Sequence, residues 1–326
     1  MNAFHRIGCL LGWLSLASVP LLAEAQPSYP NKPILMIVPL AAGSAVDAAA
    51  RIVAQKMSAN MGQQIIIENQ PGAAGLIGAE RVARAAPDGY TIGGFNDSIM
   101  TMLPNLYPKM TWDILRDFEP VSLVATVEWG LVASNDAPFK TAGDLVAAAR
   151  ANPGRIFYAS GGNGSPQHIA MALFASTAGV SMTHVPYKGA TQAAVDVAGG
   201  QVPVALQGLA TVSSLVRGNK LRLLGVTTHN RLPQFPDVPT VSESGLPGFE
   251  FNSWFAIMAP AGTTKEIVGK LNAEIVRALS DPVVRQQLND QGLTMRGSSA
   301  EELRIATRDQ LTKYARLIKQ AGITIE

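Results

Sequence analysis

Short apolar runs that end in turns of small residues and lead into helices recur along this chain, and this alternation limits its fold more than any other feature. Residues 33–39, 63–68, 90–95, 156–160 and 203–207 each have the length and composition of a buried strand. Helical patterns follow most of these runs. Strands that alternate with helices pair in parallel, so the sequence predicts an α/β fold, with ligands beyond the carboxyl ends of the strands.

The turn at residues 160–168 carries three glycines and a Ser-Pro pair. Ser165 suits the N-cap of the following helix, and Pro166 suits its first position, where no N–H is needed. Such a turn directs backbone N–H groups and the positive end of a helix outward, which favours an anion. We therefore expect the N–H groups of Asn163, Gly164 and Ser165 to contact an anionic ligand. The alternative is a tight turn with no ligand.

A second turn of this kind follows residues 33–39. Ser44 and Asp47 have the spacing of a capping box, with a shorter acid in place of glutamate. The functional interpretation is that free N–H groups at residues 42–44 hold an anion; the alternative is that both side chains only cap the helix. Arg51 lies one turn beyond Asp47 and is expected to pair with it.

Gly72, Gly75 and Gly78 superficially resemble a dinucleotide-binding fingerprint. Their spacing is wrong, and no acidic residue ends a strand about 20 residues later. These glycines instead favour close packing of a helix on the sheet, or a turn that lines a cleft. Lys188 is the one cation in the turns that follow the strands.

Two apolar segments, 121–134 and 249–258, are longer than the other strands, as expected for strands shared by two domains. The segment 100–112 between them and the first strands is loop-like. A helical tail follows, with predicted capping boxes at Thr263 with Glu266 and at Ser298 with Glu301. A tail after the second crossing indicates a return to the first domain. The predicted division is residues 26–124 plus 251–326 for one lobe and 125–250 for the other.

The N-terminus has the pattern of an export signal. A short basic region with Arg6 precedes an apolar stretch, and a small-x-small site ends at Ala25. Cleavage after Ala25 would remove Cys9, the single cysteine, and exclude a disulfide or thiolate site. We expect residues 1–25 to be a signal peptide and the mature protein to be soluble in the periplasm.

Several kinds of chemistry are missing from the sequence. A net charge of +2 leaves no basic surface for nucleic acid. The chain is 47% hydrophobic and 15% charged, which argues against disorder. It has no nucleophile elbow, no phosphate-binding loop and no metal-binding spacing among its four histidines. His168 falls at the third helical position after Ser165, where a packed or capping histidine is the default. The sequence therefore predicts binding without catalysis, cofactor or metal.

Taken in order, these turns resemble those of the Bug (TctC-like) family of extracytoplasmic solute receptors for tripartite tricarboxylate transporters. The resemblance covers nearly the whole mature chain. It rests on matching stretches at residues 29–34, 42–51, 69–75, 87–91, 162–168, 184–189, 231–240, 254–255 and 259–263. Each stretch is weak alone, but their order and spacing are specific. Ser44 stands where the family usually has a second glycine, so the ligand's identity is not transferred.

The resemblance implies a type II periplasmic-binding-protein fold, with two α/β lobes joined by two hinge strands and closing on a ligand. It also implies a small organic carboxylate held mainly by backbone N–H groups, and a monomer that delivers it to permease subunits. Besides residues of the turns, we expect Asn96, Gln207 and the hinge residue Trp129 to contact the ligand. The predicted ligand-binding set is Leu40, Ala41, Ala42, Gly43, Ser44, Asp47, Asn69, Gly72, Ala73, Asn96, Trp129, Gly162, Asn163, Gly164, Ser165, His168, Tyr187, Lys188, Gly189 and Gln207.

The class of carboxylate stays open at this level. Two facing helix N-termini suit a dicarboxylate, or one carboxylate with a polar tail. Trp129 in the cleft would favour an aromatic or bulkier acid, whereas Trp129 as a buried hinge residue would carry no such information. Two other functions are a sensor that docks on a signalling receptor and an enzyme on the same fold; no catalytic constellation supports the enzyme.

Overall fold

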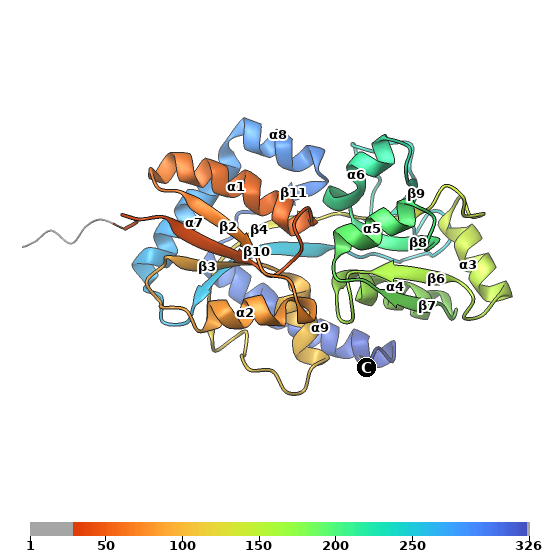
Figure 1. The fold of residues 1–326 in the computed structure, drawn as a ribbon, viewed down its shortest axis with the longest axis horizontal. Helices are drawn as coiled ribbons and strands as arrows, with labels where there is room; N and C mark the ends of the chain where they lie inside the picture. Colours follow the sequence, from red (N-terminus) through yellow and green to blue (C-terminus); the bar gives the residue numbers. More distant parts are fainter. Residues whose placement is uncertain (1–28, 325–326) are drawn as a thin grey trace, which may run out of the picture.

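The computed structural model describes residues 29–324, which form two lobes side by side, each a sheet covered by helices on both faces (Figure 1). The predicted signal peptide lies outside the described residues. The α/β class and the two-lobed architecture are confirmed. Within residues 29–324, no helix is long and apolar enough to cross a membrane.

The sheet of lobe 1 has six strands in the order β11-β4-β10-β3-β1-β2. Its parallel part consists of β1 (Ile34–Val38), β2 (Ile65–Asn69) and β3 (Thr91–Asn96). The strands β10 (Ser253–Pro260), β4 (Phe118–Val127) and β11 (Leu293–Met295) continue it in antiparallel pairing. Strands far apart in sequence therefore build one sheet.

Both faces of this sheet are covered, which explains why its strands read as continuous apolar runs. The helices α1 (Ala45–Met61) and α7 (Lys265–Ser280) pack on one face. The helix α2 (Leu76–Ala83) and the first half of α9 (Ala300–Gln320) pack on the other. The helix α8 (Pro282–Asp290) contacts α1 and α7.

The sheet of lobe 2 has five strands in the order β7-β6-β8-β5-β9. The strands are β5 (Trp129–Ala133), β6 (Phe157–Ser160), β7 (Thr183–Pro186), β8 (Val204–Gly208) and β9 (Arg222–Val226). The helices α3 (Ala142–Ala151) and α4 (Pro166–Ala178) share one core with the sheet, and α5 (Ala190–Ala198) and α6 (Leu209–Arg217) share the other. This places the N-termini of α4, α5 and α6 at the strand ends that face lobe 1.

Two segments cross between the lobes, as predicted, but their strands differ from the expected ones. The apolar segment 121–134 is two strands rather than one, because the chain leaves the first sheet at Val127 and enters the second at Trp129. The backbone of Glu128 between them bonds to both lobes: its N–H donates to Gly292 O and its C=O accepts from Leu209 N. The second crossing runs from β9 to β10, which begins at Ser253 and not at residue 249. The lobe limits at 124/125 and 250/251 stay a prediction.

The tail returns to lobe 1, but both predicted capping boxes are displaced by one residue. Thr264 caps α7 without a box, because the Thr263 hydroxyl already donates to Pro260 O at 2.7 Å. Ser299 forms the box with Glu302, because the Ser298 hydroxyl accepts from Leu123 N at 2.9 Å. A capping signal in the sequence fixes the region of a helix start, and competing contacts decide the residue.

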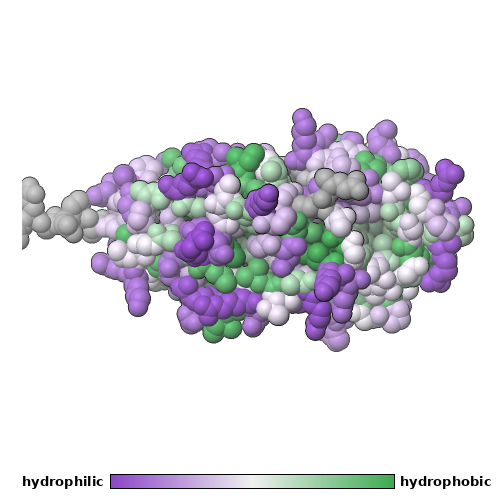
Figure 2. All heavy atoms as spheres, turned by 90° about the horizontal axis from the view of Figure 1, so that it is seen from below, coloured by the Kyte–Doolittle hydropathy of each residue, from purple (hydrophilic) through white to green (hydrophobic). Residues whose placement is uncertain are grey.

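The segment predicted as loop-like contains two short helical turns, Ser98–Met102 and Leu103–Asn105. Residues 98–103 are buried. Turns of five and three residues are too short to show a helical period, so the sequence did not reveal them. Hydrophilic side chains cover most of the face seen in Figure 2, with hydrophobic residues exposed between them in its middle.

Candidate ligand-binding site

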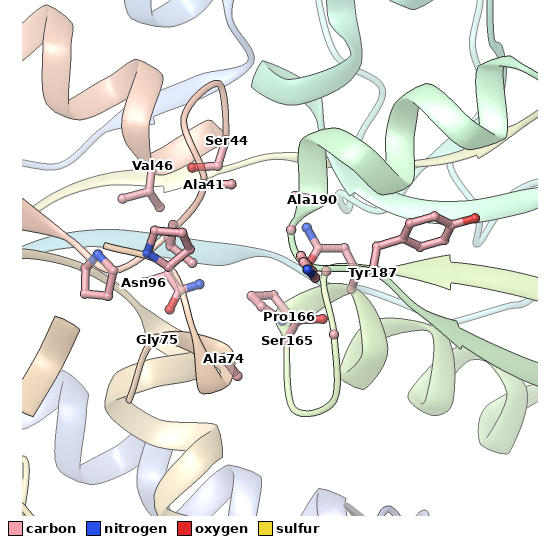
Figure 3. Close-up of a pocket in the computed structure, with 18 of the residues that line it drawn as sticks. Ala41, Ser44, Val46, Ala74, Gly75, Asn96, Ser165, Pro166, Tyr187 and Ala190 are labelled. Carbon is pink, nitrogen blue, oxygen red and sulfur yellow. The ribbon is translucent and has the colours of Figure 1, made fainter. Parts of the chain in front are cut away.

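A cavity of about 450 Å³ lies between the two lobes, at the carboxyl ends of the parallel strands (Figure 3). It is lined by Pro39, Leu40, Ala41, Ser44, Ala45, Val46, Pro71, Gly72, Ala73, Ala74, Gly75, Asn96, Tyr107, Trp129, Gly161, Gly162, Asn163, Ser165, Pro166, Gln167, Pro186, Tyr187, Lys188, Gly189, Ala190, Gly208, Thr211 and Ser253. Lys188 is the one charged residue among them, and its side chain is exposed. The described cavity therefore has little side-chain charge to offer a ligand.

The first predicted loop holds itself together with the N–H groups that were expected to bind the anion. Gly43 N donates to Asp47 Oδ2 at 2.9 Å, and Ser44 N donates to Ala41 O at 3.2 Å. The Ser44 hydroxyl accepts from Asp47 N, as its capping position predicts. The expectation that residues 42–44 offer free N–H groups is therefore wrong for Gly43 and Ser44. The unpaired donors lie one step further on, at Ala45 and Val46, which line the cavity and have no partner among the described residues.

Asp47 supports this loop from behind the cavity. Its carboxylate accepts from Gly43 N, from Arg51 Nε at 3.1 Å and from Asn69 Nδ2 at 2.9 Å. Burial acts to raise the pKa of Asp47, but the hydrogen bonds from Arg51, Gly43 and Asn69 together hold it below its usual value. The predicted Asp47–Arg51 pair is confirmed at 3.0 Å. Asp47, Asn69, Gly43 and Ala42 are not in the cavity lining.

In the glycine-rich turn of lobe 2, the unpaired N–H donor again lies further along the chain than expected. Gly164 N donates to His168 Nδ1 at 3.1 Å, and Ser165 N donates to Gly162 O at 3.0 Å. Pro166 begins the helix without an N–H, so Gln167 N is the donor of the first turn of α4 that has no partner among the described residues. Gln167 lines the cavity. The expectation that Gly164 and Ser165 present their N–H groups is wrong.

Two further helices begin at the cavity without a capping side chain. The N-cap of α5 is Gly189 and the N-cap of α6 is Gly208. The N–H groups of Ala190 and Thr211, in the first turns of these helices, have no partner in the part of the chain that the structure describes. Both residues line the cavity. Four helices, α1, α4, α5 and α6, therefore direct unpaired N–H groups and positive helix ends at one space.

Asn96 adds a side-chain donor at the end of β3. Its Oδ1 accepts from Ile99 N at 3.0 Å, which assigns the amide so that Nδ2 points away from that turn. Figure 3 shows the amide nitrogen directed into the space between the lobes. Asn96 is 3% exposed, so its Nδ2 is a nearly desolvated donor with no partner among residues 29–324.

The turn between β2 and α2 is held in an unusual backbone conformation. Gly72, Ala73, Ala74 and Gly75 all have positive φ, at 139°, 45°, 55° and 102°. Left-handed backbone costs a non-glycine residue roughly 1 kcal/mol or more, and such outliers occur at binding sites. The glycines also permit close approach, because a Cβ at Gly75 would lie 3.1 Å from Pro39 O. This supports the predicted cleft-lining turn.

The floor of the cavity is the hinge. Trp129 is 2% exposed, lines the cavity, and donates from Nε1 to the Ser253 hydroxyl at 2.9 Å. Its ring also packs edge-on against Phe251, with centroids 5.1 Å apart. Trp129 is therefore a buried hinge residue that also lines the cavity, and its preference for an aromatic acid stays a prediction.

Three predicted residues contribute differently from what was expected. His168 lies behind the glycine-rich turn, stacked on His184 with ring centroids 4.1 Å apart, and is not in the lining. Gln207 is fully buried, and its Oε1 accepts a hydrogen bond from Nε2 of the cavity residue Gln167. The backbone of Tyr187 lines the cavity, but Figure 3 shows its ring directed away into lobe 2.

Some lining residues were missed. Ala45, Val46, Gln167 and Ala190 lie in the first turns of helices that follow predicted turns. They were detectable because the first N–H groups of any helix lack internal partners. Tyr107 and Ser253 carry no local signal. Within residues 29–324, no three His, Cys, Asp or Glu side chains are grouped so that they could hold a metal ion.

The chain resembles sequences from several bacteria along almost its whole length. It is 38% identical over 306 residues to a UPF0065 protein from the tcbD-tcbE intergenic region of Pseudomonas sp. (strain P51), covering 94% of this chain and 91% of that protein. It is 32% identical to the protein BugT of Bordetella pertussis, with 100% of both chains covered.

Solved structures agree with this chain in fold as well as in sequence. The periplasmic binding protein BugD has 33% identity and a TM-score of 0.87, covering 91% of this chain and 100% of BugD. Rpa4515 of R. palustris, solved with adipate, has 32% identity and a TM-score of 0.88, with 91% and 99% covered. MatC of Rhodopseudomonas palustris, with bound malate, has 30% identity and a TM-score of 0.85, with 89% and 100% covered.

The model of one protein family, described as the tripartite tricarboxylate transporter family receptor (TctC), matches residues 49–323. This match takes in β2 to β11, both crossings and most of the cavity lining. With the whole-length similarity to BugT and the fold of BugD, it confirms the resemblance inferred from the turns. The chain belongs to the TctC family of solute-binding receptors of tripartite tricarboxylate transporters.

Proposed function

We propose that this protein is an extracytoplasmic receptor that captures a small organic carboxylate between its lobes and delivers it to the permease subunits of a tripartite tricarboxylate-type transporter. The observation that carries the proposal is the convergence of unpaired backbone donors from α1, α4, α5 and α6 on one largely apolar cavity. Backbone N–H groups bind carboxylates strongly in a desolvated site and need no buried cation.

The donor set that we assign consists of the N–H groups of Ala45, Val46, Gln167, Ala190 and Thr211, with Asn96 Nδ2. Lobe 1 supplies three of these donors and lobe 2 the other three, so the carboxylate is bound fully only when the lobes close. The relatives solved with adipate and malate support a dicarboxylate as the first ligand to test. Trp129 supports an aromatic acid as the second.

Calorimetric titration of the purified protein with adipate, malate, benzoate and their neutral amides tests this proposal. We expect a carboxylate to bind and its amide to bind far more weakly, because N–H donors favour the anion. Tight binding of an amide or a sugar, with no carboxylate bound, would contradict the proposal. Turnover of the bound acid would contradict a purely binding role.

The binding variants follow from the geometry. Asn96→Asp keeps the size of the side chain and removes the donor that faces the cavity, so affinity for a carboxylate should fall by more than tenfold. Thr211→Pro would remove one N–H group, but it also changes the first turn of α6, so Asn96→Asp is the cleaner test. Asn105→Asp is the matched control, since Asn105 donates to Thr101 O and Leu311 O and is not in the lining.

We also propose that the chain is exported and acts in the periplasm as a monomer after cleavage behind Ala25. The apolar N-terminal stretch and the periplasmic relatives support this location. Intact mass measurement of the protein from a periplasmic fraction should give a chain that begins at Gln26. A chain that retains residues 1–25 would contradict the processing step.

A further inference from the structure

Gly164 is the point at which the glycine-rich turn bonds to both lobes at once. Its N–H donates to His168 Nδ1 at 3.1 Å, within lobe 2. Its C=O accepts from the Ser98 hydroxyl of lobe 1 at 2.8 Å. Both bonds are buried, and φ of Gly164 is 76°, which favours glycine at this position.

The side chain of His168 has the chemistry to fix this turn. Because Gly164 N–H points at Nδ1, that nitrogen must be the unprotonated acceptor of a neutral ring. The ring cannot swing away, since it is stacked on His184 at 4.1 Å with an interplanar angle of 7°. His184 is held in turn by the Ser160 hydroxyl at 2.5 Å and by stacking on Tyr158. His168 is 8% exposed.

Ser98 lies two residues after the cavity residue Asn96. Its hydroxyl donates to Gly164 O, and it begins the buried short helical turn Ser98–Met102. A Cβ at Gly164 would lie 2.8 Å from Leu103 Cδ2, at the start of the next short turn of lobe 1, so the two lobes are in contact here. The position of the Gly164 backbone therefore decides whether the Ser98 bond can form.

We infer that His168 is a positioning residue, which holds the backbone of Gly164 in place so that Ser98 can bridge the lobes and close the cavity. His168 does so without contacting the ligand. The inference rests on the proposed function only where ligand affinity is concerned; the orientation of Gly164 and its coupling to Ser98 are independent of any ligand.

The first test is the hydrogen exchange of the Gly164 amide, followed by NMR on 15N-glycine-labelled protein without ligand. His168→Leu keeps a similar volume but removes the acceptor, and exchange of Gly164 should accelerate about tenfold or more. His168→Asn restores an acceptor, because Asn Oδ1 stands two bonds from Cβ, as His Nδ1 does. Exchange in His168→Asn should return to within a few-fold of the wild type. Equal acceleration in both variants would overturn the role of Nδ1.

The second test is a double-mutant cycle on the folded-to-unfolded ratio, again without ligand. Ser98→Ala removes the bond from the opposite side and should lower the ratio about fivefold. If His168 positions Gly164, the Ser98 bond is already weakened in His168→Leu. Adding Ser98→Ala to His168→Leu should then lower the folded-to-unfolded ratio only slightly further, so the two effects should not multiply. Thr191→Val is the matched control, because the Thr191 hydroxyl donates to Ala42 O at 2.9 Å and also joins the lobes, away from Gly164. Its effect should multiply with that of His168→Leu, and a multiplicative Ser98 pair would overturn the inference.

The third test is the affinity for adipate and malate. His168→Leu and Ser98→Ala should each weaken binding about fivefold, and His168→Asn should restore it. If the wild type binds neither acid, the proposed ligand class fails, while the exchange and cycle experiments still decide the role of His168. If the acids bind and His168→Asn fails to restore an affinity that His168→Leu has lost, the inference fails although the proposed function stands.

Discussion

The indole Nε1 of Trp129 lies 2.9 Å from the Ser253 hydroxyl, and this bond joins the two segments that cross between the lobes. Trp129 opens β5 in lobe 2, and Ser253 opens β10 in lobe 1. Both residues also line the cavity. The hinge and the floor of the binding site are therefore one structure.

This relationship predicts the cost of disturbing the hinge. Ser253→Ala leaves the buried indole N–H without its partner, and we expect the free energy of unfolding to fall by about 1–3 kcal/mol. Trp129→Phe removes the donor and leaves a smaller ring, with a similar loss. Chemical denaturation of both single variants and the double variant checks this. The double variant should lose clearly less than the sum of the single losses, and simple additivity would contradict the assigned bond.

Gly189 predicts how closely the lobes must approach. A Cβ at Gly189 would lie 2.8 Å from Ala41 Cβ of the opposite lobe. We expect Gly189→Ala to hinder closure and weaken carboxylate binding about tenfold, with little effect on stability, since φ of 175° is open to any residue. Gly269→Ala in α7 is the control, because a Cβ there meets nothing within 4 Å. Unchanged affinity in Gly189→Ala, measured by calorimetry, would show that the loops do not meet in this way.

The left-handed turn at residues 72–75 predicts a stabilising substitution. Ala74 has φ of 55°, and glycine adopts this conformation without strain. Ala74→Gly should raise the free energy of unfolding by up to about 1 kcal/mol, although the greater freedom of glycine in the unfolded chain offsets part of the gain. Ala79→Gly in the interior of α2 should instead destabilise by about 1 kcal/mol. Thermal unfolding of the two variants gives the comparison, and a destabilised Ala74→Gly would refute it.

The stacked histidines predict an acid-sensitive stability. Burial lowers the pKa of His168 to about 4; burial, and then the charge of His168, lower the pKa of His184 to about 4. The ordinary value is 6.5. Between pH 6.5 and 4 the two histidines become protonated in the unfolded chain but stay neutral in the native protein. The free energy of unfolding therefore falls as the pH falls through this range.

The slope should be at most about 1.4 kcal/mol per pH unit for each histidine. The groups that face the pair are Tyr158, the Ser160 hydroxyl and the Gly164 N–H. No ion pair with a carboxylate forms at either ring in the described chain. His168→Asn should reduce the slope by the share of one histidine. Equal slopes in the wild type and His168→Asn would contradict the assignment. Urea unfolding at several pH values measures them.

Local sequence rules were sufficient where the interactions are local. Ser165 caps α4 and Ser44 caps α1 because their hydroxyl groups bond to N–H groups three residues on. The strands, the turns after them and the two crossings follow from apolar runs and small residues. These features depend on the covalent neighbourhood of each residue, and a single chain displays that neighbourhood directly.

The donors of the site could not be assigned in this way. The sequence shows that a turn is rich in N–H groups, but it does not show that Gly43 N is taken by Asp47 or that Gly164 N is taken by His168. Each of these bonds depends on the fold of the turn around a side chain. The N–H groups without a partner among the described residues therefore lie one or two residues further along the chain than predicted, inside the helices, at positions such as Val46 and Gln167.

The sequence by itself determined the α/β class, the two-lobed architecture and the places where helices begin near a cleft. Only the tertiary structure decided that His168 and His184 stack, that Ser98 reaches Gly164, and that Trp129 meets Ser253. The partners in these pairs are separated by 16, 66 and 124 residues, respectively. No local pattern encodes such contacts, because they exist only after two sheets have brought distant strand ends to one edge.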